Sequence, residues 1–191
     1  MSEPISRVVL VTGGNRGIGL ACAKAFVAAG HRVAVTCRGE APTEVSEAGI
    51  LAVPCDVTDT EQVDAAFTAI EEQLGPVEIL VANAGITRDG LVLRMSDDDF
   101  TDVLDANLTG AFRVCRRAVR RMIKGRWGRI VLVSSVAGRV GSLSLLLPLP
   151  LPCRCLHLSG TTAASTSTSL PLPLPPTPPH YHHNLHLLAA A

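Results

Sequence analysis

The feature that most constrains the fold is an alternation of short apolar segments with amphipathic segments between residues 5 and 142. Five segments rich in Val, Ile and Leu have the length of buried strands: residues 7–13, 32–37, 50–55, 77–85 and 129–135. Strands that are apolar on both faces are typical of a parallel sheet with helices on each side. Because crossover connections between parallel strands are right-handed, the alternation predicts a doubly wound α/β fold.

Three segments between these strands have helical spacing. Residues 19–30 close with a glycine, a common signal for the end of a helix. Residues 59–75 begin with an N-capping aspartate, and residues 96–125 begin with a serine and several aspartates that suit the helix dipole. We therefore expect an incomplete Rossmann-like parallel sheet of five strands in the order 3-2-1-4-5, with the fifth strand as an exposed apolar edge.

The composition changes after residue 142. Residues 143–191 hold nine of the 13 prolines, no acidic residue and a single charged residue, Arg154. Proline-rich and Ser/Thr-rich sequence without periodicity cannot pack an apolar face. We therefore expect a truncated Rossmann domain over residues 1–142 and a disordered low-complexity tail over residues 143–191.

The charge distribution, the apolar runs and the cysteines indicate the cellular compartment of the chain and the kinds of partner it can have. All 17 acidic residues lie at or before Asp105 and ten of the 17 Lys and Arg residues lie after it, so the surface is predicted to be polarised. The N-terminus has no signal-peptide pattern, and prolines interrupt the Leu-rich run over residues 143–158. Four of the six cysteines, at positions 22, 37, 55 and 115, are scattered as in reduced intracellular chains, so we expect a cytoplasmic protein without a membrane partner.

A glycine-rich turn joins the first strand to the first helix. It reads TGGNRGIG over residues 12–19. Glycines let the backbone approach a pyrophosphate closely, and the N-terminus of the following helix offers free N–H groups and a positive dipole. The strand–turn–helix context favours a dinucleotide site over the alternative, an ordinary turn between a strand and a helix.

The TGxxxGxG spacing resembles that of short-chain dehydrogenases/reductases. Four further motifs follow in the order typical of that family: CDVTD (55–59), NAG (83–85), NLTG (107–110) and VSSVAG (133–138). The resemblance covers residues 1–142 and is greatest to bacterial 3-oxoacyl-[acyl-carrier-protein] reductases of fatty-acid synthesis.

The resemblance implies site residues. Asp56 would contact the adenine, Ser135 would hydrogen-bond the substrate carbonyl, and Asn107 would position a water of the proton relay. The residues implied to bind the cofactor are Gly13, Asn15, Arg16, Gly17, Ile18, Gly19, Arg38, Asp56, Val57, Asn83, Ala84 and Gly85.

The end of the second strand bears on the choice of cofactor. It reads Thr36-Cys37-Arg38, without the acid that would accept the ribose 2′-OH of NADH. A guanidinium suits a 2′-phosphate by its charge and fork geometry, and Arg16 and Arg38 would supply it. We therefore expect NADP(H), the alternative being two solvated arginines.

A basic face is predicted on the last helix, formed by Arg113, Arg117, Arg120, Arg121 and Lys124. One interpretation is a solvated face that pairs with acids of residues 97–105 or of another subunit. The other is docking of an acidic acyl carrier protein, and the resemblance implies Arg126, with Arg129, for this role. Nucleic acid is not expected as a partner, since aromatic residues and a matching fold are lacking.

The proton donor of the resembled enzymes is missing. In them a Tyr about 13 residues after the Ser supplies a proton, and a Lys four residues later lowers the Tyr pKa. Those positions hold Pro148 and Pro152, and the single tyrosine, Tyr181, is followed by Leu185 where the Lys would stand. The family is homotetrameric, and the helix that carries the Tyr, which packs against a neighbouring subunit, is also missing here.

Three interpretations therefore stay open. The chain is a reductase with an unrecognised proton donor, a non-catalytic remnant that binds NADP(H) or a carrier protein, or a truncated or frame-shifted product without function. We expect little or no reductase activity. Cysteines and histidines in residues 153–157 and 180–186 have no recognised zinc spacing, so no specific metal site is expected.

Overall fold

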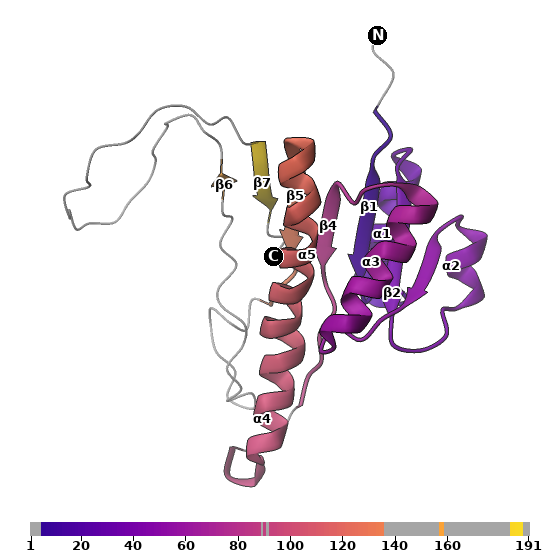
Figure 1. The fold of residues 1–191 in the computed structure, drawn as a ribbon. Helices are drawn as coiled ribbons and strands as arrows, with labels where there is room; N and C mark the ends of the chain where they lie inside the picture. The colour runs from indigo at the N-terminus through magenta and orange to yellow at the C-terminus, as the bar shows by residue number, and fades with distance from the viewer. Residues whose placement is uncertain (1–4, 89, 91, 136–156, 159–183, 189–191) are drawn as a thin grey trace, which may run out of the picture.

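The computed structural model describes residues 5–88, 90, 92–135, 157–158 and 184–188. The five predicted strands are present as β1 (Val8–Thr12), β2 (Arg32–Cys37), β3 (Leu51–Pro54), β4 (Ile79–Ala82) and β5 (Trp127–Leu132). They are parallel and lie in the order β3-β2-β1-β4-β5, which confirms the predicted order (Figure 1).

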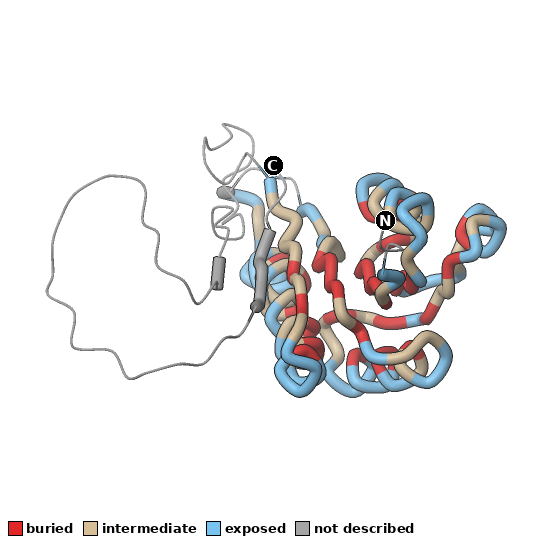
Figure 2. Tube along the Cα trace, turned by 90° about the horizontal axis from the view of Figure 1, so that it is seen from above, coloured by how far each residue is buried: buried red, intermediate tan, exposed pale blue. Residues whose placement is uncertain are grey.

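Helices cover both faces of this sheet. Helices α1 (Gly17–Ala28) and α2 (Thr43–Glu47) contribute Leu20, Ala23 and Val45 to one buried cluster. Helix α3 (Thr60–Leu74) packs Phe67 and Ile70 into the other cluster, which it shares with the last long helix. The strands are buried between these two layers (Figure 2), as continuous apolar strands require.

The last long helix has three parts: α4 (Asp97–Leu104), the π-turn η2 (Asp105–Thr109) and α5 (Gly110–Gly125). The sequence predicts this helix as one regular element. Ser96 caps it through a reciprocal pair of hydrogen bonds with Asp99, as the acidic start suggested. Periodicity did not indicate the π-turn, helix α2 or the short 3₁₀ turn η1 (Val92–Arg94).

The sheet continues beyond β5. Strand β7 (Asn184–Leu188) pairs parallel with β5, and β6 (His157–Leu158) pairs antiparallel with β7. The expectation that β5 forms an exposed edge is therefore wrong. An unpaired strand edge presents a row of N–H and C=O groups that a short extended segment can satisfy, and the biased composition around NLHLL concealed such a segment. The remaining residues of the predicted tail over 143–191 are not among those that the structure describes.

Two further expectations concern cysteines and membrane spans. The described cysteines, Cys22, Cys37, Cys55 and Cys115, are free thiols. Within the described ranges, no helix combines the length and the apolar character needed to cross a bilayer.

Candidate functional site

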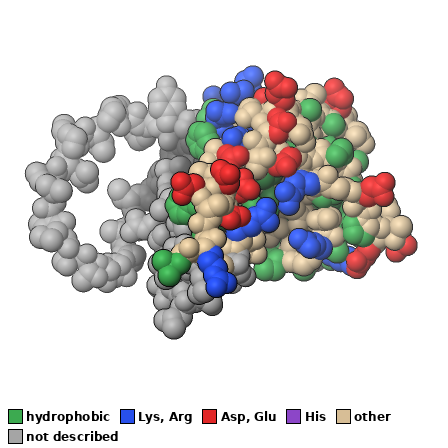
Figure 3. Space-filling model, turned by 90° about the horizontal axis from the view of Figure 1, so that it is seen from below, with side chains coloured by type: hydrophobic (Ala, Val, Ile, Leu, Met, Phe, Trp, Pro, Cys, Tyr) green, Lys and Arg blue, Asp and Glu red, His purple; other side chains and the backbone are tan. Residues whose placement is uncertain are grey.

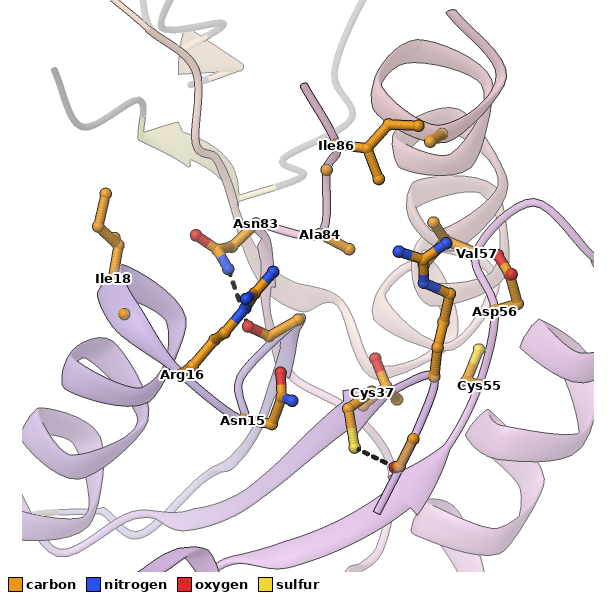
Figure 4. A pocket seen from close by; sticks show the side chains of 17 residues that line it. Asn15, Arg16, Ile18, Cys37, Cys55, Asp56, Val57, Asn83, Ala84 and Ile86 are labelled. Atoms are coloured by element: carbon orange, nitrogen blue, oxygen red, sulfur yellow. Dashed lines mark hydrogen bonds between the residues drawn. The ribbon is translucent and has the colours of Figure 1, made fainter. Parts of the chain in front are cut away.

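A cavity of about 470 Å³ opens at the carboxyl ends of the parallel strands (Figure 4). It lies where the strand order reverses between β1 and β4, the position at which doubly wound sheets bind ligands. Eleven of the twelve residues that the sequence assigned to the cofactor line it: Gly13, Asn15, Arg16, Gly17, Ile18, Arg38, Asp56, Val57, Asn83, Ala84 and Gly85.

Six more residues line the cavity: Thr36, Cys37, Gly39, Cys55, Ile86 and Ala106. The sequence analysis assigned none of them to the cofactor. Four of them are immediate chain neighbours of assigned residues, so extending each motif by one position would have found Cys37, Gly39, Cys55 and Ile86.

The glycine loop packs closely against the segment after β4. Gly19 does not line the cavity, but a Cβ there would lie 2.4 Å from the carbonyl oxygen of Gly13 and 2.5 Å from Nδ2 of Asn83. Gly13 has a φ of +64°, and its Cβ would lie 3.0 Å from the Cα of Ala84. The loop therefore requires glycine for close approach at position 19 and for backbone conformation at position 13.

Hydrogen bonds hold this loop against β4. The Thr12 hydroxyl oxygen accepts hydrogen bonds from the backbone N–H groups of Asn83 and Ala84, each at 3.0 Å. The Asn83 amide nitrogen donates to the carbonyl oxygens of Thr12 at 3.1 Å and Gly13 at 3.2 Å. The ends of β1 and β4 are thereby joined, which fixes the shape of the cavity floor.

The N-terminus of α1 faces the cavity without a side-chain cap. Its N-cap is Arg16, whose side chain makes no capping hydrogen bond, so the first turn keeps unsatisfied backbone N–H groups. Those groups and the positive end of the helix dipole favour an anion. Asn15, Arg16 and Ile18 surround this end of the cavity (Figure 4).

The end of β2 carries a neutral thiol where an acid would favour NADH. Cys37 is buried and its Sγ donates a hydrogen bond to the carbonyl oxygen of Gly39 at 3.1 Å. Burial raises the pKa of the Cys37 thiol above its ordinary value, and the Gly39 bond opposes this less strongly. The exposed Arg38 follows it along the rim. This end of the cavity is therefore cationic rather than anionic.

A second thiol lies at the end of β3. Burial raises the pKa of Cys55 to about 11, and the nearby carboxylates of Asp56 and Asp59 act in the same direction. A protonated thiol is a poor nucleophile, so Cys55 serves as a wall of the cavity. The Asp56 carboxylate accepts hydrogen bonds from the backbone N–H of Thr58 at 2.9 Å and its hydroxyl at 2.8 Å, which holds it at the rim.

Asn107 lies in the π-turn and holds the segment after β4. Its Oδ1 accepts a hydrogen bond from the backbone N–H of Ile86 at 2.8 Å, and its Nδ2 donates to the Ile86 carbonyl at 2.9 Å. A Cβ on Gly85 would lie 3.0 Å from Asn107 Oδ1. Both ends of the Asn107 amide are thus bonded to backbone, and the side chain fixes Ile86 in the cavity wall.

Ser135 follows β5 at the carboxyl edge of the sheet and is exposed. It does not line the 470 Å³ cavity. The predicted catalytic serine and asparagine are therefore not brought together in that cavity. Positions 148, 152 and 181, where a proton donor was sought, lie outside the described residues.

Part of the predicted basic face is engaged in ion pairs within the chain. Arg113 pairs with Asp105 at 2.9 Å, and Arg117 pairs with Glu71 at 3.0 Å and Asp64 at 3.4 Å. Their side chains are only 18% and 14% exposed. These two arginines therefore hold the long helix to its own π-turn and to α3. The expected pairing with residues 97–105 is present for Arg113.

The two predicted docking arginines have different surroundings. Arg126 ends α5 in a left-handed conformation with a φ of +52° and is exposed. The guanidinium of Arg129 lies 4.8 Å from the centre of the Trp127 ring, whose other near cation is Arg7 at 3.5 Å. Burial, and then the charge of Arg7, lowers the pKa of Arg129. Arg126 is thus the more accessible of the pair.

The described residues contain no group of three or more His, Cys, Asp or Glu residues that could hold a metal ion.

Comparison with known proteins adds three matches. The short chain dehydrogenase family model matches residues 7–146. The 3-oxoacyl-[acyl-carrier-protein] reductase MabA of Mycobacterium avium is 56% identical over 137 residues, which cover 72% of this chain and 52% of MabA. The corresponding reductase FabG of Aquifex aeolicus is 45% identical over 145 residues, which cover 72% of this chain and 58% of FabG.

Among solved structures, a single-substitution variant of the actinorhodin polyketide ketoreductase with NADPH is similar, with a TM-score of 0.70 and 37% identity. The match covers 75% of this chain and 59% of the ketoreductase. The chain thus spans a little over half the length of the relatives that it matches.

Proposed function

Because the chain belongs to the short chain dehydrogenase family, we propose that its 470 Å³ cavity binds NADP(H). The observation that carries this proposal is the meeting of an uncapped helix N-terminus, two arginines and a neutral thiol in one cavity. An anion-binding helix end suits the pyrophosphate, and a rim with Arg16 and Arg38 suits an additional 2′-phosphate.

The other lining residues have assigned places in this proposal. Asp56 and Val57, after β3, would hold the adenine. Asn83, Ala84 and Gly85, after β4, would support the cofactor, and Gly19 keeps the loop close enough to do so. The proposed cofactor-binding unit covers residues 1–142, and the described strands β6 and β7 from residues 143–191 extend its sheet.

MabA and FabG are 3-oxoacyl-[acyl-carrier-protein] reductases, so we propose the same substrate class for the fold that this chain shares with them. NADPH supplies the hydride in that chemistry. Ser135 would hydrogen-bond the substrate carbonyl, and Asn107 acts by positioning Ile86. Of the two predicted docking residues, Arg126 is the better proposal for contact with an acidic carrier, since Trp127 engages Arg129.

We propose further that this chain binds NADP(H) without efficient turnover. Prolines stand at positions 148 and 152, and no Tyr followed four residues later by Lys occurs in the sequence. Without a positioned acid the developing alkoxide has no proton source, and general acid catalysis contributes about 10²–10⁴-fold to rates.

The experiment is NADPH oxidation with acetoacetyl-CoA as a soluble substitute for the carrier-linked substrate, run beside an intact relative such as MabA. We expect a rate at least about a hundredfold below that relative. A rate within a hundredfold would contradict the non-catalytic assignment.

A further inference from the structure

The first residue of α5 contacts the wall of the cavity. A Cβ on Gly110 would lie 2.8 Å from Cγ2 and 3.1 Å from Cβ of Val57, so a larger residue there would push Val57 aside. Val57 is 8% exposed and lines the cavity. Figure 4 shows Asp56 and Val57 beside the long helix. The wall that we propose holds the adenine therefore rests against the start of α5.

Arg113, which lies almost one turn further along α5, reaches the backbone of the same wall. Its Nη1 donates to Asp105 Oδ1 at 2.9 Å and to the Val57 carbonyl oxygen at 3.5 Å. The Arg113 side chain is 18% exposed, so protein shields much of it from solvent. Asp105 is the first residue of the π-turn η2, and its ion pair with Arg113 spans that turn. The ion pair therefore fixes the guanidinium that contacts Val57.

The peptide group between Val57 and Thr58 is held at both ends. Arg113 contacts its carbonyl oxygen, and its N–H group, which belongs to Thr58, donates to Asp56 Oδ1 at 2.9 Å. The Thr58 hydroxyl donates to the same Asp56 oxygen at 2.8 Å. Hydrogen bonds that form a chain through one peptide group polarise and strengthen each other. The Asp56 carboxylate is therefore connected to Arg113 through a single peptide group.

The charge of Arg113 also suits the acidic segment that it contacts. Seen from below, acidic and basic side chains lie close together on the molecule (Figure 3). Hydrogen bonds from Gln62 are the main cause of the lowered pKa of Asp59, and the positive charge of Arg113 acts in the same direction. The guanidinium of Arg113 thus acts on residues 56–59 both by contact and by charge.

We propose that Arg113 is a positioning residue for adenine recognition, because it fixes the Val57–Thr58 peptide group and, through it, the Asp56 carboxylate. This inference rests on the proposed function, in which Asp56 and Val57 hold the adenine. A carboxylate accepts a hydrogen bond from the exocyclic amino group of adenine. Hypoxanthine carries a carbonyl oxygen in place of that amino group and offers the carboxylate no donor there.

The preference for adenine is therefore the quantity that Arg113 should control. A hydrogen bond to a charged group corresponds to about tenfold to a hundredfold in affinity, so the unsubstituted chain should prefer NADPH to its hypoxanthine analogue by about that ratio. An arginine with a purely structural role would change the stability of the chain and leave this ratio unaltered.

The test is fluorescence titration of the full chain with NADPH and with its hypoxanthine analogue, comparing the ratio of the two Kd values. R113M keeps an apolar stem and removes the donors, so it should lower the preference for adenine by about three- to tenfold. The matched control is R117M on the same helix. Arg117 is 14% exposed, and its ion-pair partners Glu71 and Asp64 lie on α3 outside the cavity lining. R117M should lower Tm and leave the ratio unchanged.

Two further variants make the test specific. R113K keeps a charge toward Asp105 but is shorter, so it should lose the Val57 contact and also lower the ratio, and it serves where R113M does not fold. In a D56N background R113M should change the ratio much less than in the parent chain, because both substitutions act through one carboxylate.

The possible failures are distinguishable. The parent's ratio in folded R113M, or in R113K where R113M does not fold, would overturn this inference alone, as would an equal fall in R117M. Absence of NADPH binding by the unsubstituted chain would contradict the proposed function and this inference together.

Discussion

Gly19 and Gly13 lie so close that a Cβ on Gly19 would be 2.4 Å from the Gly13 carbonyl oxygen. The first helix and the end of the first strand therefore share a space that only hydrogen can fill at position 19. This contact, together with the Asn83 amide bonded to the Gly13 carbonyl at 3.2 Å, sets the position of the loop that we propose holds the pyrophosphate.

The substitution G19A should disrupt this loop. Its Cβ would meet backbone, which cannot move aside as a flexible side chain can, so we expect a lower Tm and at least tenfold weaker NADPH binding. The matched control is G125A, where no atom lies within 4 Å of the new Cβ and the backbone is not left-handed. G125A should leave both quantities nearly unchanged. Unaltered NADPH affinity in folded G19A would contradict the role of this contact.

Substitution by valine should change the free energy of unfolding in opposite directions at two neighbouring threonines. Thr12 and Thr36 are partners across β1 and β2 and are both 2% exposed. The Thr12 hydroxyl accepts two backbone hydrogen bonds, whereas the Thr36 hydroxyl has no partner in the described structure. T12V leaves two partly buried N–H groups without their acceptor and should lower the free energy of unfolding by about 1–3 kcal/mol.

T36V removes a buried hydroxyl that bonds nothing, so it should raise the free energy of unfolding by up to about 1 kcal/mol. Urea denaturation of both variants measures these changes. A loss of stability in T36V as large as that in T12V would show that the Thr36 hydroxyl has a bonding partner.

The strand order could be predicted because it depends on local signals, and the eleven cavity residues were predicted from the glycine-rich turn and from motifs that resemble those of short-chain dehydrogenases/reductases. Apolar strands and glycine-rich turns can be recognised directly in the sequence. A parallel topology then brings the carboxyl ends of the strands, where the motifs lie, to one edge of the sheet. The π-turn around Asn107 could not be predicted, because the hydrogen bonds that accompany it reach Ile86, 21 residues away. Thr12 was missed for the same reason, since its partners lie on β4.

Strand β7 was missed for a different reason. Its pairing with β5 joins Trp127 to Asn184 across more than 50 residues, and the sequence around it has biased composition. Composition indicates whether a segment can build its own core. It does not indicate whether five residues can satisfy an edge that another part of the chain presents.

The coenzyme preference should depend on Cys37. C37D places an anion where the 2′-phosphate is proposed to bind, and supplies an acceptor for a ribose 2′-OH. Charge-assisted hydrogen bonds are worth about 1.5–3 kcal/mol, so we expect NADPH binding to weaken by about tenfold to a hundredfold while NADH binding improves. C37A is the control and should keep the original preference. An unchanged preference in C37D would place the 2′-phosphate elsewhere.

The helix cap at Asp59 should make stability depend on pH. Hydrogen bonds from the side chain and backbone of Gln62 hold the pKa of Asp59 below its ordinary value. The group therefore stabilises the fold above its unfolded pKa, and this stabilisation is lost as the pH falls through the folded pKa. D59A should lower Tm by a few degrees at neutral pH and by progressively less below about pH 5.

The matched variant D59N keeps a capping oxygen without the charge, so its Tm at neutral pH should lie between those of the parent chain and D59A. The check is a series of thermal melts of all three chains from neutral to acidic pH. A Tm difference between the parent chain and D59A that stays constant down to about pH 3 would exclude the proposed linkage.

The central claim is that this chain keeps a working NADP(H) cavity. Its most direct test is a fluorescence titration of the full chain with NADPH and with NADH under the same conditions. We predict saturable binding of both, with NADPH at least about tenfold tighter because Arg16 and Arg38 add charge-assisted contacts. No saturable binding of NADPH, or tighter binding of NADH, would contradict the account.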